Sequence, residues 1–393
     1  MRTLPIFLAF FLMGLADAMG PNADAVKDFY RLDNKMSTLL SFVVFIAFAV
    51  CSVPGGVLAA RIGKKKLLLL GLGLNALALV APSVTVPSFA VLLVCIFALG
   101  VGTTFLQVAG NPIMRDVSPE GKYSRNLAFA QGVKGVGSCA STFLVTAISA
   151  WVLLKAMDWR AAFPLFCALM TLAFVSVAFL KVKETKLDEP PSIGSSLALL
   201  KERAFALAVL GIFLYVGAEA SLGRFLKPTL MDFGLDKQTA NTLGPTLFFA
   251  LLALGRILGG AVLAVMTPRT CFRLSALLGL LGALALMIGS KPLAFAGIVA
   301  SGLGFASIWP MLFSITVEEK PQCANELSGL MCMAISGGAL VPLLMAELSD
   351  LKFGATSFIV PTACFAYLLV LSLTSGRKTA APAPQPSPEV TKA

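Results

Sequence analysis

Long apolar runs dominate this chain, and clusters of charged, proline and turn residues divide them into twelve segments. A transmembrane helix needs about 20 mostly apolar residues to cross about 30 Å of hydrocarbon, and the segments have suitable lengths. The runs are continuous and do not alternate with polar residues, which excludes a membrane β-barrel. We therefore predict an all-α membrane protein with twelve transmembrane helices, at residues 4–26, 38–60, 67–84, 88–113, 126–151, 159–181, 204–230, 240–265, 273–290, 293–317, 326–348 and 354–375.

The composition agrees with a membrane protein and removes most enzyme classes. Of the 393 residues, 58% are hydrophobic and 13% are charged, whereas soluble proteins average about 45–50% and about 25%. Histidine is absent from the sequence, which removes the usual zinc motifs and the Ser/His and Cys/His catalytic pairs. The eight cysteines are scattered singly, as small buried hydrophobic residues are, without the spacing of a disulfide framework or a metal site. We expect a protein that is not an enzyme and has no metal or cofactor.

Lysine and arginine set the expected orientation, because these residues concentrate in cytoplasmic loops. The predicted loops on the side of the two termini carry 19 of them, and the opposite loops carry nine. Both termini should therefore face the cytoplasm, in a multi-pass protein of the cytoplasmic membrane. The same asymmetry, together with binding to anionic lipids, accounts for the net charge of +11 without a nucleic-acid partner.

A weak internal repeat divides the chain into two six-helix bundles. Asp17 and Glu219 match at an offset of 202 residues, and Pro112 and Pro310 match at an offset of 198. The GVKGVG and ISGGAL segments and two basic turns match at similar offsets. We predict an N-terminal bundle, a cytoplasmic linker, a C-terminal bundle and a disordered cytoplasmic tail, at residues 1–181, 182–203, 204–376 and 377–393.

Several motifs carry a resemblance to a known family. The run GGVLAARIGKKK at residues 55–66 resembles the loop signature between helices 2 and 3 of the major facilitator superfamily, with Ala60 at the family's acidic position. Within that superfamily the chain resembles the fucose:proton symporter group of sugar permeases. The motifs of that likeness are VAGNP, YVGAE, Gly255-Arg256, SIWPMLFSI and SGGALVP. The resemblance implies two pseudo-symmetric bundles and a proton symporter that moves a small polar solute, most simply a sugar, by alternating access.

The same resemblance points to the groups that couple transport to protons. Asp17, with Pro21 four residues later, matches an essential acid of helix 1 in fucose permease. The family's second acid falls at Gln107, which cannot exchange a proton. The second protonation role is therefore either absent or moved to another residue, for which Glu219 is the candidate. The proton is thus the expected coupling ion, with Asp17 and Glu219 as the proton-coupling residues.

Polar residues within the spans are the candidates for substrate binding, because a charge near the bilayer centre costs about 2.5–3.5 kcal/mol. Their alternative roles are structural: a buried acid hydrogen-bonded to a neighbouring helix, amide contacts between helices, and aromatic packing. Lys134 either neutralises an acid such as Asp17 or binds an anionic substrate. Arg224 is the rival structural partner of Glu219, but a separation of five residues places the two side chains about 140° apart around the helix. The candidate substrate-binding residues are Gln107, Asn111, Gln131, Lys134, Tyr215, Glu219 and Trp309.

Other functions stay open at this point. Lys134 and Arg224 would also suit a carrier of organic anions or sugar acids, or a drug exporter of the same fold. A membrane receptor or sensor on a transporter scaffold is the alternative outside transport, although the soluble segments are short. The expected partners are a small-molecule substrate and membrane lipid, and we expect a monomer.

Overall fold

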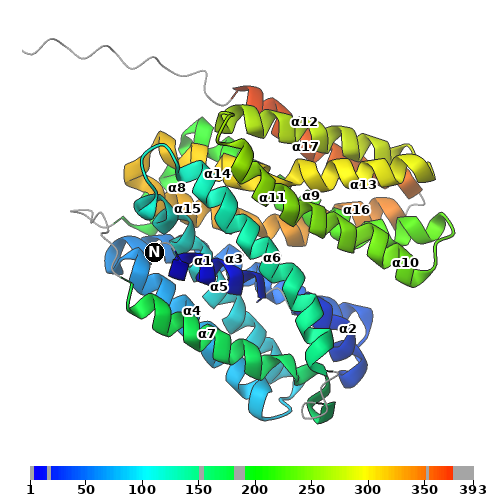
Figure 1. The fold of residues 1–393 in the computed structure, drawn as a ribbon, viewed down its shortest axis with the longest axis horizontal. Coiled ribbons are helices and arrows are strands. Elements are labelled where there is room, and N and C mark those ends of the chain that lie inside the picture. Colours follow the sequence, from blue (N-terminus) through cyan, green and yellow to red (C-terminus); the bar gives the residue numbers. More distant parts are fainter. Residues whose placement is uncertain (1–3, 16–18, 150–154, 181–190, 351–353, 375–393) are drawn as a thin grey trace, which may run out of the picture.

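The computed structural model describes residues 4–15, 19–149, 155–180, 191–350 and 354–374. Every regular element in these ranges is a helix, as the continuous apolar runs predict. In Figure 1 the elements of the N-terminal half (blue to green) gather on one side and those of the C-terminal half (lime to red) on the other. Helices α6 (Tyr123–Ser149) and α11 (Leu247–Val262) cross the middle, where the two halves meet.

The helices of the N-terminal half follow the first six predicted spans. The first span falls on two helices, α1 and α2, and residues 16–18 between them lie outside the described ranges. Besides α6, this half contains α1 (Leu4–Leu15), α2 (Met19–Tyr30), α3 (Asn34–Ile62), α4 (Lys64–Val84), α5 (Phe89–Val117), the 3-10 helix η2 (Lys155–Arg160) and α7 (Ala162–Ala178).

The C-terminal half follows the last six spans, but three of these spans are interrupted. A π-helical turn containing Pro245 precedes α11, Ser307 separates α13 from α14, and a 3-10 turn separates α15 from α16. After the linker helices α8 (Ile193–Ala198) and η3 (Leu199–Lys201), the elements of this half besides α11 are α9 (Arg203–Asp232), α10 (Lys237–Asn241), η4 (Thr242–Thr246), α12 (Pro268–Met287), α13 (Lys291–Ala306), α14 (Ile308–Glu319), η5 (Pro321–Cys323), α15 (Ala324–Met333), η6 (Ala334–Ser336), α16 (Gly337–Asp350), η7 (Gly354–Phe358) and α17 (Ile359–Thr374).

The linker and the tail are described only in part. Part of the predicted linker forms the short helices α8 and η3, directly before α9. The rest of it, residues 182–190, lies outside the described ranges, as does the predicted tail at 377–393.

Nine helical segments of the described chain are long and apolar enough to cross a membrane, and α1 and α7 are apolar but shorter. Helix α6 has 27 residues but is not among the nine. It carries Gln131 and Lys134, so its average is less apolar. The central position of α6 explains this composition, because a helix surrounded by protein does not need an entirely apolar surface.

Glycines allow the helices of the two halves to touch. A Cβ atom at Gly56 of α3 would lie 2.6 Å from the carbonyl oxygen of Asn325 on α15. A Cβ atom at Gly132 of α6 would lie 2.8 Å from Cγ1 of Ile257 on α11. Backbones can approach this closely only where the side chain is a hydrogen, as is common between membrane helices. The contact between the halves therefore depends on these glycines.

Packing within each half repeats at the offset of the sequence repeat. In the N-terminal half, Gly137 of α6 packs against the carbonyl group of Phe11 on α1. In the C-terminal half, Gly337 of α16 packs against the carbonyl group of Phe213 on α9. The two phenylalanines are 202 residues apart and the two glycines 200. The same helix contact therefore occurs once in each half, in agreement with the repeat.

Candidate functional site

A cavity of about 190 Å³ lies where α3, α5 and α6 meet the 3-10 turn η6. Because η6 belongs to the C-terminal half, the cavity lies between the two halves. Its volume is below the about 300–1,000 Å³ typical of pockets for drug-sized ligands, so it suits a small solute. It is lined by Val44, Phe45, Phe48, Leu99, Gly100, Thr103, Gln107, Lys134 and Ile335.

The polar side of this cavity combines an amide, an ammonium group and a hydroxyl group. Gln107 and Lys134, both predicted from the sequence, line it together with Thr103. Thr103 lies four residues before Gln107 on α5 and so shares its helix face, which is a signal the sequence analysis did not use. Donors and acceptors on a wall of otherwise apolar residues suit a solute with hydroxyl groups and an apolar face.

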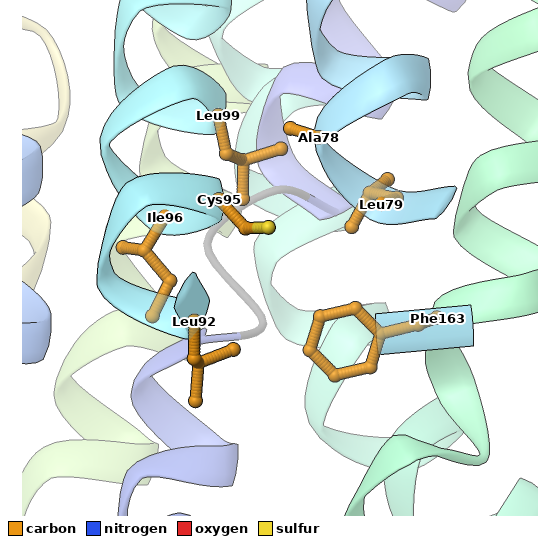
Figure 2. A pocket seen from close by; sticks show the side chains of 7 residues that line it. All are labelled: Ala78, Leu79, Leu92, Cys95, Ile96, Leu99 and Phe163. Atoms are coloured by element: carbon orange, nitrogen blue, oxygen red, sulfur yellow. The ribbon is translucent and has the colours of Figure 1, made fainter. Parts of the chain in front are cut away.

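A second cavity has none of this character. Figure 2 shows that its walls are apolar side chains and one cysteine, from α4, α5 and α7 within the N-terminal half. Its volume is about 10 Å³, which is at most enough for one water molecule. This space is a packing gap and not a solute site. The residues around it are Ala78, Leu79, Leu92, Cys95, Ile96, Leu99 and Phe163.

Two of the predicted binding residues contact each other. Nε2 of Gln131 on α6 donates to Oδ1 of Asn111 on α5 at 3.1 Å, and the hydroxyl group of Tyr123 donates to the Asn111 carbonyl oxygen at 3.1 Å. Asn111 is fully buried and Gln131 is 2% exposed. These bonds connect α5 to α6, and neither amide is among the residues lining the cavity. The geometry favours the structural alternative for this pair, with Gln107 and Lys134 facing the cavity.

A buried arginine organises a second polar cluster, in the C-terminal half, whose members are not among the residues lining the cavity. Nη2 of Arg256 on α11 donates to the hydroxyl oxygen of Tyr215 on α9 at 3.0 Å. The same nitrogen lies 3.8 Å from Oε2 of Glu219, one helical turn further along α9. Arg256 belongs to the Gly255-Arg256 motif, but it is not among the residues that the sequence predicted to bind substrate. Arg224, the other arginine considered as a partner of Glu219, is exposed.

Aromatic side chains extend this cluster. The Tyr215 ring lies 6.3 Å from the Trp309 ring and 5.2 Å from the Phe305 ring, centroid to centroid. Trp309 is 4% exposed, and its indole nitrogen has no hydrogen-bond partner among the described residues. The Glu219 side chain is 22% exposed, whereas that of Arg256 is 9% exposed. The cluster therefore contains a partly accessible carboxylate and a buried indole N–H group without a partner among the described residues, and both kinds of group can bind hydroxyl groups.

Asp17 lies outside the described residues, so its role as a proton carrier stays a prediction. The end of α1 that precedes it packs closely on α6, where Gly14 contacts the carbonyl group of Lys134. No ion pair to the Lys134 ammonium group is found within the described ranges.

Comparisons with known proteins agree with this architecture. The sequence profile of the Major Facilitator Superfamily matches residues 6–342. A glucose/galactose transporter of Brucella abortus is 28% identical over 383 residues, covering 94% of this chain and 92% of that protein. A putative glucose/galactose transporter of Helicobacter pylori is 29% identical over 389 residues, covering 93% and 94%. A crystal structure of the fucose:proton symporter of Escherichia coli superposes with a TM-score of 0.84 at 20% identity, covering 96% of this chain and all of that one. The predicted all-α fold is thus confirmed.

Proposed function

Since this chain belongs to the Major Facilitator Superfamily, we propose that it is a secondary active transporter that carries a sugar across the membrane by alternating access, as a proton symporter. The relatives that are similar over nearly the whole chain are named for glucose and galactose. The similar crystal structure is that of a fucose:proton symporter. Neutral hexoses are therefore the first substrates to test.

The cavity between the halves is the observation that carries this proposal. A solute bound there touches α3, α5 and α6 of one half and η6 of the other. Rocking of the halves about such a site would open it to each side of the membrane in turn. Gln107 and Thr103 can exchange hydrogen bonds with sugar hydroxyl groups, and Phe45 and Phe48 can pack against the apolar face of a sugar ring.

We assign the coupling proton to a carboxyl group, because the chain has no histidine. Asp17 and Glu219 are the two carboxyl groups at matching positions of the repeat. In a symporter, binding of the proton and binding of the sugar favour the same closed state, so each raises the apparent affinity of the other.

Uptake into vesicles tests the proposed function directly. The purified full chain is reconstituted into liposomes, and uptake of labelled glucose, galactose and fucose is measured with and without an inward proton gradient. We expect one of these sugars to accumulate only with the gradient, and its entry to alkalinise a weakly buffered medium. Asp17→Asn should abolish accumulation while leaving sugar exchange across the membrane. Uptake of none of the sugars, or accumulation that ignores the gradient, would refute sugar–proton symport.

Lys134 favours a second candidate function, transport of an anionic sugar acid. Its ammonium group is at the cavity, where it would attract a carboxylate more strongly than in water because the surroundings are apolar. Competition between a neutral hexose and its uronic acid in the same vesicles separates the two functions. If the uronic acid is the preferred substrate, Lys134→Gln should reverse the preference. If the neutral sugar is preferred, the variant should change proton dependence more than selectivity.

We also propose a monomer in the cytoplasmic membrane with both termini in the cytoplasm. The distribution of lysine and arginine supports the orientation. Reporter fusions at each terminus, active on only one side of the membrane, test the orientation. Light scattering of the detergent-solubilised chain tests the oligomeric state.

A further inference from the structure

We infer that Arg256 is a positioning residue, which fixes the Glu219 carboxylate for recognition of a hydroxyl pair on the sugar. In this arrangement Glu219 contributes to substrate specificity, and of the two candidate proton carriers only Asp17 remains. The inference rests on the proposed sugar transport and deepens it, because it assigns a task to a residue outside the predicted binding set.

The geometry of three side chains on two helices supports this role. Tyr215 and Glu219 are four residues apart, so they project from the same face of α9. One nitrogen of Arg256 reaches both of them from α11, at 3.0 Å and 3.8 Å. The bond to the tyrosine hydroxyl group holds the guanidinium group in place, and the guanidinium group in turn limits where the carboxylate can lie.

The difference in exposure leaves the carboxylate available to a ligand. The Arg256 side chain is 9% exposed, whereas that of Glu219 is 22% exposed. A carboxylate has about four acceptor positions, so contact with one guanidinium nitrogen leaves positions for two hydroxyl groups. The indole N–H group of Trp309, whose ring lies 6.3 Å from the Tyr215 ring, is a further buried donor without a hydrogen-bond partner among the described residues. This set suits neighbouring hydroxyl groups of a neutral sugar and disfavours an anion.

The pairing also argues against Glu219 as the coupling group. An arginine side chain stays protonated under all physiological conditions. Arg256 therefore keeps a permanent positive charge 3.8 Å from the Glu219 carboxylate. A carboxyl group without a fixed cation is better suited to repeated proton exchange.

The position of Arg256 links this cluster to the opposite half. Its helix packs on α6, where a Cβ atom at Gly132 would lie 3.5 Å from the carbonyl carbon of Arg256 and one at Gly135 would lie 3.0 Å from Cβ of Ala253. These two glycines flank Lys134, which lines the cavity. Arg256 therefore sets the carboxylate on one half relative to the polar cavity wall on the other.

Sugar exchange in vesicles containing the full chain tests the inference, with the sugar that the wild-type protein transports and its monodeoxy analogues. In the wild type, we expect the analogue lacking the hydroxyl group bound by Glu219 to have an about tenfold higher KM, as for a hydrogen bond to a charged group. In Arg256→Met the KM for the parent sugar should rise about tenfold at nearly unchanged kcat, and the penalty for the deoxy analogue should disappear. Arg256→Lys, which keeps the charge, should recover part of both effects. Arg224→Met, at an exposed arginine of α9, is the matched control and should leave KM unchanged.

Glu219→Gln separates sugar recognition from proton coupling. We expect a raised KM with sugar accumulation still driven by the proton gradient at saturating sugar. The double variant Arg256→Met/Glu219→Gln removes both charges of this pair, so neither is left without the other. It controls for misfolding of Arg256→Met, and its KM should match that of Glu219→Gln. The inference is overturned if the deoxy penalty persists in the folded Arg256 variants, or if Glu219→Gln keeps its KM and loses proton-driven accumulation. If the wild type transports no sugar at all, it is the proposed function that fails.

Discussion

A single methyl group at Gly56 should shift the protein between the conformations of its transport cycle. Gly56→Ala places a Cβ atom 2.6 Å from the carbonyl oxygen of Asn325 and 3.3 Å from Cα of Gly329, both backbone atoms of α15. Backbone atoms of a packed helix cannot move aside as the end of a flexible side chain can. The substitution therefore opposes the conformation in which α3 and α15 touch. Alternating access requires a second conformation in which these helices separate, and that conformation does not contain this clash.

The neighbouring glycine provides the control for the magnitude. A Cβ atom at Gly55 would meet only side chains of its own half, the nearest being Cδ1 of Phe105 at 3.3 Å. Both substitutions bring the same gain in helix propensity, about 1 kcal/mol, so this gain cancels in the comparison. Overpacking of a rigid contact costs about 1–3 kcal/mol. Gly56→Ala should therefore change the ratio of the two conformations by about 5- to 150-fold relative to Gly55→Ala.

Distances between spin labels measure this shift. Labels are placed through Arg61→Cys near the end of α3 and Gln322→Cys before α15, both exposed, in a background without the native cysteines. Electron-spin resonance without sugar should show a long-distance population that grows in Gly56→Ala and stays at the wild-type level in Gly55→Ala. Equal distributions in the wild type and both variants would refute the idea that the Gly56 contact holds the halves together.

Three further predictions concern pairs or groups that the sequence did not connect. Lys64 and Asp116 form an ion pair with side chains 7% and 8% exposed. Asp116→Asn should therefore lower the free energy of unfolding by about 3–5 kcal/mol, and an unchanged midpoint of thermal unfolding in detergent would contradict this. Alanine at either Asn111 or Gln131 should lower the free energy of unfolding by about 1–3 kcal/mol, because the other amide loses its hydrogen-bond partner. The double alanine variant should lose less than the sum of the two single variants, whereas additive losses would mean that the bond contributes nothing. Trp309→Phe keeps an aromatic ring and removes the indole N–H group, so it should raise the KM for sugar several-fold at constant stability; an unaltered KM would exclude the indole N–H from recognition.

The sequence by itself determined the membrane architecture, because hydropathy accumulates along the chain and needs no knowledge of neighbours. Twelve apolar runs predicted the spans, and the described helices follow them, including α6 with its lower hydropathy. The same logic singled out Gln107 and Lys134, since a polar residue in an apolar run is costly unless it is used. Both residues line the central cavity. The interruptions before α11, at Ser307 and between α15 and α16 were not predicted, because each lies within one predicted span and hydropathy does not distinguish an α-helical turn from a 3-10 or π-helical turn.

Only the tertiary structure decided which polar groups meet. Asn111 and Gln131 were predicted to bind substrate, but the approach of α5 to α6 brings their amides together. Arg256 stood in the sequence only within a motif, and the structure brings its guanidinium group from α11 to both Tyr215 and Glu219 of α9. Residue spacing fixes which side chains share a face of one helix, but not how neighbouring helices are rotated and how closely they approach. Close packing of glycines and side chains across the whole bundle sets the rotation and the separation of the helices. These in turn determine which partner each charged side chain contacts.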